Sequence, residues 1–284
     1  MIKSLIIILL LLALGALILL VALRLRDSHA DAALAERLES ASAEPPPRFS
    51  AAMLEGLPEP AARFFRFAVQ PGTPLKTRAV ITMSGTLALS GDGSEQTMRA
   101  RQVLAPPHGL IWPVRLSGLP FVTGTDAFAG GESWSRFRVF DLVPVGRISE
   151  DADHRRSSFG RMVGEGLFWT PAAFLPAAEV GWDRIEWRAV GDNSAAVTVE
   201  KDGLVQEARI DLAADGRPLR AVFPRWSNEN PERIYRRQPF GGDLSEFRNF
   251  EGFRLPTMVT GGNHYGTPEY FPFFKARVEN VTFL

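Results

Sequence analysis

The run from Leu5 to Leu23 constrains this chain more than any other feature, because its nineteen residues include no charged or strongly polar side chain. As a helix rising about 1.5 Å per residue, the run spans about 28 Å, the thickness of one bilayer hydrocarbon core. The apolar region of a cleaved secretory signal is shorter, about 7–15 residues. We therefore expect an uncleaved single-pass transmembrane anchor within residues 1–30. Cleavage is the alternative, since Ser28-His29-Ala30 offers a small-residue site.

The charges that flank this run give little information on orientation. Lys3 and the amino terminus precede it, and Arg24 and Arg26 follow it, partly offset by Asp27 and Asp31. A count of basic residues near the two ends is close to a tie. An N-terminal anchor of this kind commonly carries an exported domain, so we expect the globular part on the extracytoplasmic side of the membrane.

The rest of the chain divides at a proline-rich segment. Residues 31–50 begin with apolar side chains at helical spacing and end in EPPPRFS (44–50), which cannot continue a helix because proline fixes φ and lacks a donor. We expect a helical stalk and linker there, followed by one globular domain over residues 51–284. Its first element is predicted to be a helix over 57–69, opened by Pro58 or Pro60.

Two features of the composition exclude classes of function. The chain has 32 basic and 32 acidic side chains, whereas a nucleic-acid-binding protein usually carries a basic excess. It has no cysteine, which excludes disulfides, thiolate zinc sites, a cysteine nucleophile and a lipidated N-terminal cysteine.

Alternating apolar and polar residues predict the fold class, a mostly β, α+β domain with one antiparallel sheet. The turn signals GDG (91–93), KDG (201–203) and ADGRP (214–218) favour hairpins over the helical crossovers of a parallel sheet. The predicted strands, about eight in number, lie within 77–90, 98–105, 109–116, 132–140, 195–213, 218–226, 253–262 and 273–284.

A helix interrupts the strand pattern over residues 153–176. Phe159, Met162, Val163, Gly166 and Leu167 follow the one-faced period of an amphipathic helix. We expect its N-cap at Ser157 or Ser158, its end at Thr170, and a second helical turn from Pro171.

The apolar segment GLFWTPAAFLP (166–176) within that region could be core, a membrane-dipping loop or a lid. Its one-faced period and its short length, broken by Pro171 and Pro176, favour a lid or plug across the sheet.

Six stretches of the domain match one bacterial family when taken together. They are LPEPAARFFRF (57–67), QVLAPPHGLIW (102–112), GLPFVTGTDAF (118–128), EGLFWTPAAFLP (165–176), IEWRAVGDNSAAVTV (185–199) and FGGDLSEFRNFEGFRLPT (240–257). The chain thus resembles a membrane-anchored family known as a domain of unknown function, numbered 6544 or 6920. The resemblance implies the strongly curved, half-open barrel of periplasmic lipoprotein carriers, with helices plugging the concave face. It brings no catalytic residues, and it supports a hydrophobic ligand by analogy alone.

Tests for catalytic motifs find none, and no metal or cofactor is implied. The four histidines, His29, His108, His154 and His264, are scattered without metal-ligand spacing. GESWS (131–135) departs from the nucleophile elbow, and GGDLSEF (241–247) is interpreted as a turn rather than a phosphate cradle. An enzyme is therefore disfavoured, although an acid–base pair could still assemble in space.

Aromatic side chains supply the candidate ligand-binding residues. Such residues are typical first of a packed core, because aromatic side chains dominate cores by area, and the alternative is the wall of an apolar cavity. Trp169, at the predicted helix break, is the strongest candidate. The full apolar set is Trp112, Phe168, Trp169, Phe174 and Trp187.

Four arginines in 225–242 add a polar candidate. Arg225 and Arg236 could hold a phosphate or carboxylate head group beside an apolar mouth. Arg233 and Arg237 belong to the same cluster. The alternative is a solvated loop in which Glu229 or Glu232 pairs with these arginines.

These observations favour a membrane-anchored protein that binds a lipid or acyl chain between sheet and lid. The alternative is a structural or partner-binding envelope protein with a solid core, whose protein partner the sequence does not identify. A cavity of a few hundred Å³ would favour the first, and a filled interior the second.

Overall fold

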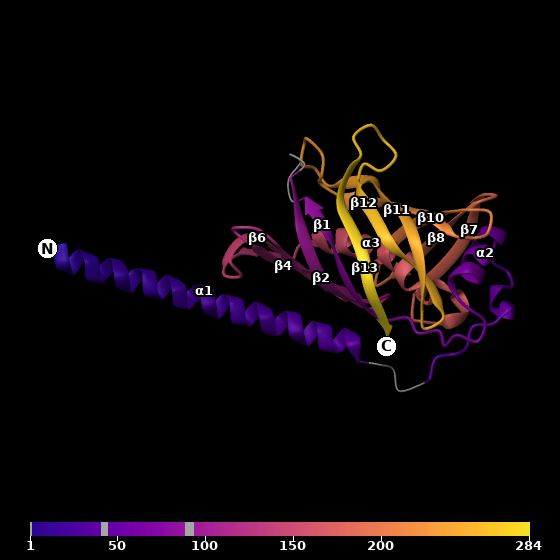
Figure 1. Ribbon diagram of the computed structural model, residues 1–284, viewed down its shortest axis with the longest axis horizontal. Helices are drawn as coiled ribbons and strands as arrows, with labels where there is room; N and C mark the ends of the chain where they lie inside the picture. The colour runs from indigo at the N-terminus through magenta and orange to yellow at the C-terminus, as the bar shows by residue number, and fades with distance from the viewer. Residues whose placement is uncertain (1, 41–44, 89–93) are drawn as a thin grey trace.

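A single helix leads into the domain. The computed structural model describes residues 2–40, 45–88 and 94–284, so the predicted turn at 91–93 and part of the predicted stalk and linker, 41–44, lie outside the described residues. Helix α1 (Ile2–Glu39) is continuous through the predicted anchor and into the predicted stalk, and it projects far beyond the rest of the molecule (Figure 1). It is long and apolar enough to span a membrane, a test that an N-terminal signal sequence also passes.

The domain is built on one antiparallel sheet. Its strands are β1 (Ala79–Ala88), β2 (Glu95–Ala105), β3 (Gly109–Leu116), β4 (Val122–Ala129), β5 (Glu132–Val139), β6 (Val143–Ser149), β7 (Arg184–Gly191), β8 (Ser194–Lys201), β9 (Leu204–Leu212), β10 (Pro218–Ser227), β11 (Arg236–Phe250), β12 (Phe253–Asn263) and β13 (Phe271–Phe283). The thirteen strands are ordered β6-β5-β4-β3-β2-β1-β13-β12-β11-β10-β9-β8-β7 across the described residues. Two meanders therefore meet where β1 pairs with β13.

The sheet is strongly curved and does not close, because β6 and β7 lie at its two ends (Figure 1). This confirms the predicted fold class, a mostly β, half-open antiparallel sheet covered by helices. The hairpins predicted at KDG and ADGRP join β8 to β9 and β9 to β10.

Four strands were not predicted from the alternation, namely β4, β6, β7 and β11. The interpretation of GGDLSEF as a turn was wrong, since these residues lie within β11. Gly242 explains part of the difference, because a Cβ there would lie 2.6 Å from the carbonyl oxygen of Thr260. A strand whose neighbour approaches this closely needs glycine, and the glycine hides the apolar alternation.

Helix α3 (Ala152–Trp169) lies across the concave face, where it contacts β2 to β5 on one side and β9, β10 and β12 on the other. The predicted one-faced stripe from Phe159 to Leu167 is buried. The predicted N-cap at Ser157 or Ser158 was wrong. The helix begins nearly two turns earlier, and Asp151 caps it by accepting a 2.7 Å hydrogen bond from the backbone N–H of His154.

A close approach fixes the position of α3 on the sheet. A Cβ at Gly164 would lie 2.1 Å from the ring of Phe223 on β10. After the helix ends, Pro171 and Pro176 open two 3₁₀ turns, η2 (Pro171–Phe174) and η3 (Pro176–Ala178). The predicted break is confirmed, with short turns in place of a second α-helix.

The first elements of the domain seal one end of the sheet. The 3₁₀ turn η1 (Ala51–Leu54) precedes α2 (Glu59–Ala68), whose position and opening prolines match the prediction. Phe64 and Phe65 on α2 are buried against the ring of Trp187 on β7. The main hydrophobic core therefore extends from this end along the inside of the curve.

A second, smaller core lies on the convex face, under the last turns of α1. Leu34 and Leu38 are buried there against Val103, Ile111 and Trp134. The end of α1 is therefore packed on the sheet through an apolar contact, while the segment from Leu5 to Leu23 is free of the domain.

Candidate ligand-binding cavity

A cavity of about 730 Å³ lies between α3 and the concave face of the sheet. The exposed residues of its lining, Ile148 on β6 and Glu229 and Arg233 after β10, mark its mouth near the first turns of α3. The interior lies between the helix and strands from both halves of the sheet. The cavity therefore lies between the sheet and the helix, where a ligand was expected from the sequence.

Aromatic rings form much of the cavity wall. Trp112 on β3 meets the ring of Phe274 on β13 at 6.2 Å, and Phe240 on β11 meets those of Phe223 and Phe273 at 5.2 and 6.0 Å. Such rings offer a large apolar area at fixed positions. The wall is therefore suited to an apolar chain.

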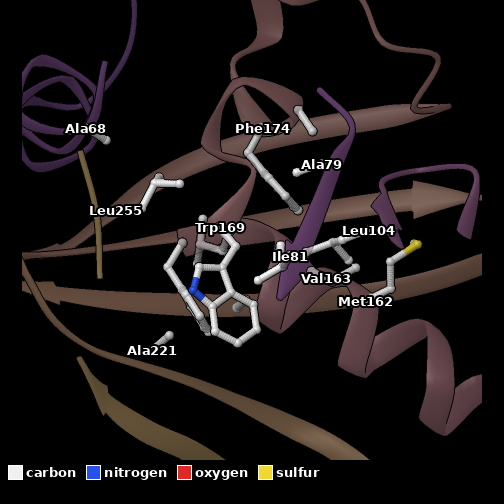
Figure 2. Close-up of a cluster of buried hydrophobic side chains, with 14 of the residues drawn as sticks. Ala68, Ala79, Ile81, Leu104, Met162, Val163, Trp169, Phe174, Ala221 and Leu255 are labelled. Carbon is white, nitrogen blue, oxygen red and sulfur yellow. The ribbon is translucent and has the colours of Figure 1, made fainter. Parts of the chain in front are cut away.

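Trp169 lies at the end of α3 and belongs to both the core and the cavity wall. Its side chain is 1% exposed and stands among Ile81, Ala221 and Leu255 (Figure 2). The indole Nε1–H donates to the carbonyl oxygen of Pro256 at 3.3 Å. Phe168 lies beside it, with ring centroids 4.8 Å apart, and also lines the cavity.

A charged cluster crosses the cavity near α3. Arg161 donates to Glu165 at 2.7 Å and to Asp126 at 2.8 Å, and its guanidinium lies 4.8 Å from the ring centroid of Trp112. Burial opposes the charge on Arg161, but the attraction of Glu165 and Asp126 outweighs it and raises the pKa of Arg161. The positive charge of Arg161 is therefore balanced by two carboxylates of the protein itself.

Arg225 on β10 lines the same cavity without such a partner. Its Nε donates to the hydroxyl of Ser157 at 3.1 Å, and its guanidinium lies 4.9 Å from the ring centroid of Phe240. Among the residues that the structure describes, no carboxylate lies within ion-pairing distance of it. Burial and the charge of Arg161 lower the pKa of Arg225 to about 10, so it stays protonated at neutral pH.

His154 also belongs to the polar part of the lining, on the first turn of α3. Burial lowers its pKa, and its Nδ1 lies 2.9 Å from the hydroxyl of Ser133. Ser133 is buried and does not line the cavity, so this pair offers no nucleophile to a ligand.

The structure thus brings four of the seven predicted ligand-binding residues to one cavity: Trp112, Phe168, Trp169 and Arg225. In the part of the chain that the structure describes, the other three predicted residues do not line this cavity. Phe174 and Trp187 pack together in solid core, where the indole N–H of Trp187 donates to the carbonyl oxygen of Phe174 at 2.9 Å. Arg236 is exposed.

The predicted arginine cluster does not form a single site. Arg236 pairs with Glu232 at 3.0 Å and Arg233 with Glu229 at 3.4 Å, as the solvated-loop alternative described. Arg225 differs because it lies on β10 and points into the cavity.

Sequence reasoning missed the cluster around Arg161. One signal was available, because Arg161 and Glu165 are four residues apart on the predicted helix, the spacing of an ion pair. The third member, Asp126, lies on β4, a strand that was not predicted, so its proximity could not be inferred.

The family of unknown function numbered 6544 matches residues 47–276, and the chain belongs to this family. The resemblance stated from the six stretches is therefore confirmed, with the first of its two numbers. Among curated proteins, none matches the sequence.

Three solved structures are similar to the chain at low sequence identity. A LolA superfamily protein from Nitrosomonas europaea has a TM-score of 0.40 at 12% identity, covering 80% of this chain and 92% of its own. A domain named for outer membrane lipoprotein sorting, from Vibrio parahaemolyticus, has a TM-score of 0.39 at 11% identity, covering 82% and 91%. A DUF1329 family protein from Desulfovibrio piger has a TM-score of 0.41 at 12% identity, covering 79% and 90%.

Proposed function

We propose that this protein is a membrane-tethered binder of an apolar ligand, a lipid or an acyl chain, held between the curved sheet and α3. The observation that carries the proposal is the cavity of about 730 Å³, a size typical of small-molecule sites, which span about 300–1,000 Å³. A structural or partner-binding envelope protein with a solid core would fill this space at normal packing density. The cavity therefore favours the binder over that alternative.

The residues proposed to hold the ligand divide by chemistry. Trp112, Phe168 and Trp169 contact the apolar chain along the aromatic wall. Arg225, near the mouth, binds a carboxylate or phosphate head group. Its Nε is occupied by Ser157, which leaves its two terminal nitrogens for the paired oxygens of an anion.

The anchor is proposed to remain on the mature protein, with the domain on the extracytoplasmic side. Asp27, which would be lost by cleavage after Ala30, is 1% exposed and lies in a cluster with three arginines of the sheet. A removable signal would not serve as the partner of buried charges, because a buried charge left without its partner is costly. This supports an uncleaved anchor that holds the cavity beside the bilayer.

A bulky side chain placed in the cavity tests the proposal. Val259 lines the cavity on β12, so the ring of Val259→Phe would occupy ligand space. We expect the purified protein to bind a pyrene-labelled fatty acid, and Val259→Phe to lose that binding while it unfolds at nearly the same temperature.

The matched control is Val205→Phe, the same substitution on an exposed face of β9, 44% exposed. It should bind the probe as the unaltered chain does. Equal binding by both variants, or no binding by the unaltered chain, would overturn the proposal.

A further inference from the structure

The helix that enters the membrane is fixed to the sheet by charge as well as by apolar contact. Asp27 on α1 accepts hydrogen bonds from Arg138 on β5 and, at 2.5 and 2.9 Å, from Arg147 on β6, and Arg136 lies 3.5 Å away. One turn further along, the indole N–H of Trp134 donates to Asp31 at 2.8 Å. Because α1 is continuous, these contacts fix the angle between the apolar segment and the sheet.

A contact directly beside the apolar segment shows which end of the sheet lies nearest to that segment. Arg24 directly follows Leu23, and it forms a two-pronged bond, 3.0 and 3.1 Å, with Asp141 in the turn between β5 and β6. Since Arg24 lies where α1 leaves the bilayer, this turn lies at the membrane surface. Figure 1 agrees, because β6 is the part of the sheet that reaches furthest along α1 towards the N-terminus.

The side chains at this end of the sheet are apolar and exposed. They include Leu119 (92% exposed), Phe140 (54%), Val143 (45%) and Val145 (60%). The loop before β4 and the turn after β5 lie together, since the rings of Phe121 and Phe140 are 5.6 Å apart and the N–H of Phe140 donates to the carbonyl oxygen of Phe121. An apolar patch on an edge strand is an aggregation hazard in water.

The backbone of the turn gives a second, independent indication. Phe140 and Asp141 have φ of 55° and 59° at the centre of the turn that the hydrogen bond from the N–H of Leu142 to the carbonyl oxygen of Val139 closes. Asn and Gly are favoured there, and a bulky residue is a genuine outlier. A phenylalanine held in this conformation, with its ring exposed, is typical of a functional contact.

We infer that this end of the sheet is a second membrane contact, in which Leu119, Phe140, Val143 and Val145 insert into the interfacial layer of the bilayer beside α1. We call these four residues the membrane rim. The inference rests on the anchoring by α1 proposed above. Arg115 lies beside the rim, with its guanidinium 4.2 Å from the ring centroid of Phe121.

The rim connects the bilayer with the ligand site. Ile148, on the same strand as Val143 and Val145, is 41% exposed and lines the cavity mouth together with Phe137 on β5. An acyl chain leaving the bilayer beside the rim therefore meets the mouth along β6, without crossing the convex face.

Single cysteines test the rim directly, because the chain has none of its own. Phe140→Cys and Val145→Cys are labelled with the fluorophore NBD and the full chain is inserted into phosphatidylcholine–phosphatidylglycerol vesicles that carry a nitroxide near the top of the acyl chain. Val190→Cys is the matched control, since Val190 is an exposed valine (44%) on β7, the strand at the opposite end of the sheet.

We expect quenching at positions 140 and 145 to exceed quenching at 190 several-fold. Equal quenching at the three positions in vesicle-bound protein would overturn the membrane rim and leave the cavity proposal intact. Failure of the chain to float with vesicles would overturn the anchoring by α1 and the rim with it. Loss of fatty-acid binding, measured separately with Val259→Phe, bears on the cavity alone.

Discussion

At the residue scale, two charged side chains define the properties of the molecule. Arg225 keeps a positive charge inside a cavity walled in part by aromatic rings, without a carboxylate partner in the described residues, and its neighbour Arg161 has two. Asp27 is the reverse case, a buried carboxylate shared by three arginines. Arg225 is therefore available to a ligand, whereas Asp27 holds α1 on the sheet.

Replacement of Arg225 should change which ligands bind. Arg225→Gln is expected to weaken binding of a fatty acid about tenfold or more, since a hydrogen bond to a charged group contributes about 1.5–3 kcal/mol. Binding of the fatty alcohol of equal length should change little. Arg236→Gln is the control, because Arg236 is exposed and lies outside the lining. An equal loss for acid and alcohol would contradict a role in head-group binding.

Asp27 predicts an acid-sensitive contact between α1 and the sheet. Burial opposes its charge, but the hydrogen bond from Arg147 and the charges of Arg136, Arg147 and Arg138 outweigh burial and lower its pKa from 3.8. A carboxylate with a lowered pKa stabilises the folded state fully above its ordinary value, and the stabilisation is lost as pH falls through the folded-state value. We expect the contact between α1 and the sheet to weaken progressively as pH falls below the ordinary aspartate value of about 4, and the fluorescence of Trp134, which packs against α1, to report the change.

The control for this titration is Asp27→Asn, which removes the titrating group. It should destabilise the contact at neutral pH by up to about 3 kcal/mol, because it leaves buried arginines uncompensated, and it should reduce the acid-induced change. Asp141, whose pKa is also lowered, holds α1 through Arg24, so its protonation is expected to contribute to the change. An unaltered acid transition in Asp27→Asn would contradict the assignment.

At the element scale, α3 and the edge strand β6 show why some elements could be predicted from the sequence and others could not. The stripe from Phe159 to Leu167 has a strong period, so the helix and its burial were predicted. Strand β6 (VPVGRIS) has Pro144 and Gly146 and is exposed along its whole length, so no buried alternation marks it. The N-cap was misplaced because Ser157 and Ser158 resemble a cap, although Asp151 precedes an acidic first turn.

The candidate site was predicted only in part for a related reason. Alternation separates the two faces of a strand, but it does not say which face becomes concave. Phe174 and Trp187 resemble Phe168 and Trp169 in sequence, yet only the latter pair lines the cavity, because tertiary packing decides which rings meet and which border a void.

The fit of α3 on β10 depends on Gly164. Gly164→Ala would place a Cβ 2.1 Å from the ring of Phe223, which forces the helix or the ring to move. We expect a loss of about 1–3 kcal/mol in the free energy of unfolding, measured by denaturant titration. Phe223→Leu combined with Gly164→Ala should recover part of that loss. Stabilisation by Gly164→Ala, as expected from helix propensity alone, would contradict the close packing.

At the scale of the whole molecule, helix α1 is one rigid connection between the apolar segment and the sheet that bears the cavity. Helix α1 carries the apolar segment and the buried Asp27 without a break, so the orientation of the half-open sheet follows from the direction of the helix. The alternative of a cleaved signal predicts instead that the residues before Asp31 are dispensable.

Two shortened chains distinguish these alternatives. A chain that begins at Arg24 keeps the partners of Arg138, Arg147 and Asp141, and a chain that begins at Asp31 loses them. We expect the shorter chain to unfold several degrees lower in a thermal scan, since unpaired buried arginines are costly. Equal unfolding temperatures would indicate that residues 24–30 are dispensable for the domain.

The most direct test of the central claim is to identify what the cavity holds in the cell. The full chain is purified under mild conditions alongside Val259→Phe and Val205→Phe, and each preparation is extracted with solvent and analysed by mass spectrometry. We predict one lipid or fatty acid, near one molecule per chain, in the unaltered protein and in Val205→Phe, and its depletion in Val259→Phe. Well-folded protein that yields no ligand, or the same ligand at the same amount from all three chains, would contradict a cavity that binds an acyl chain.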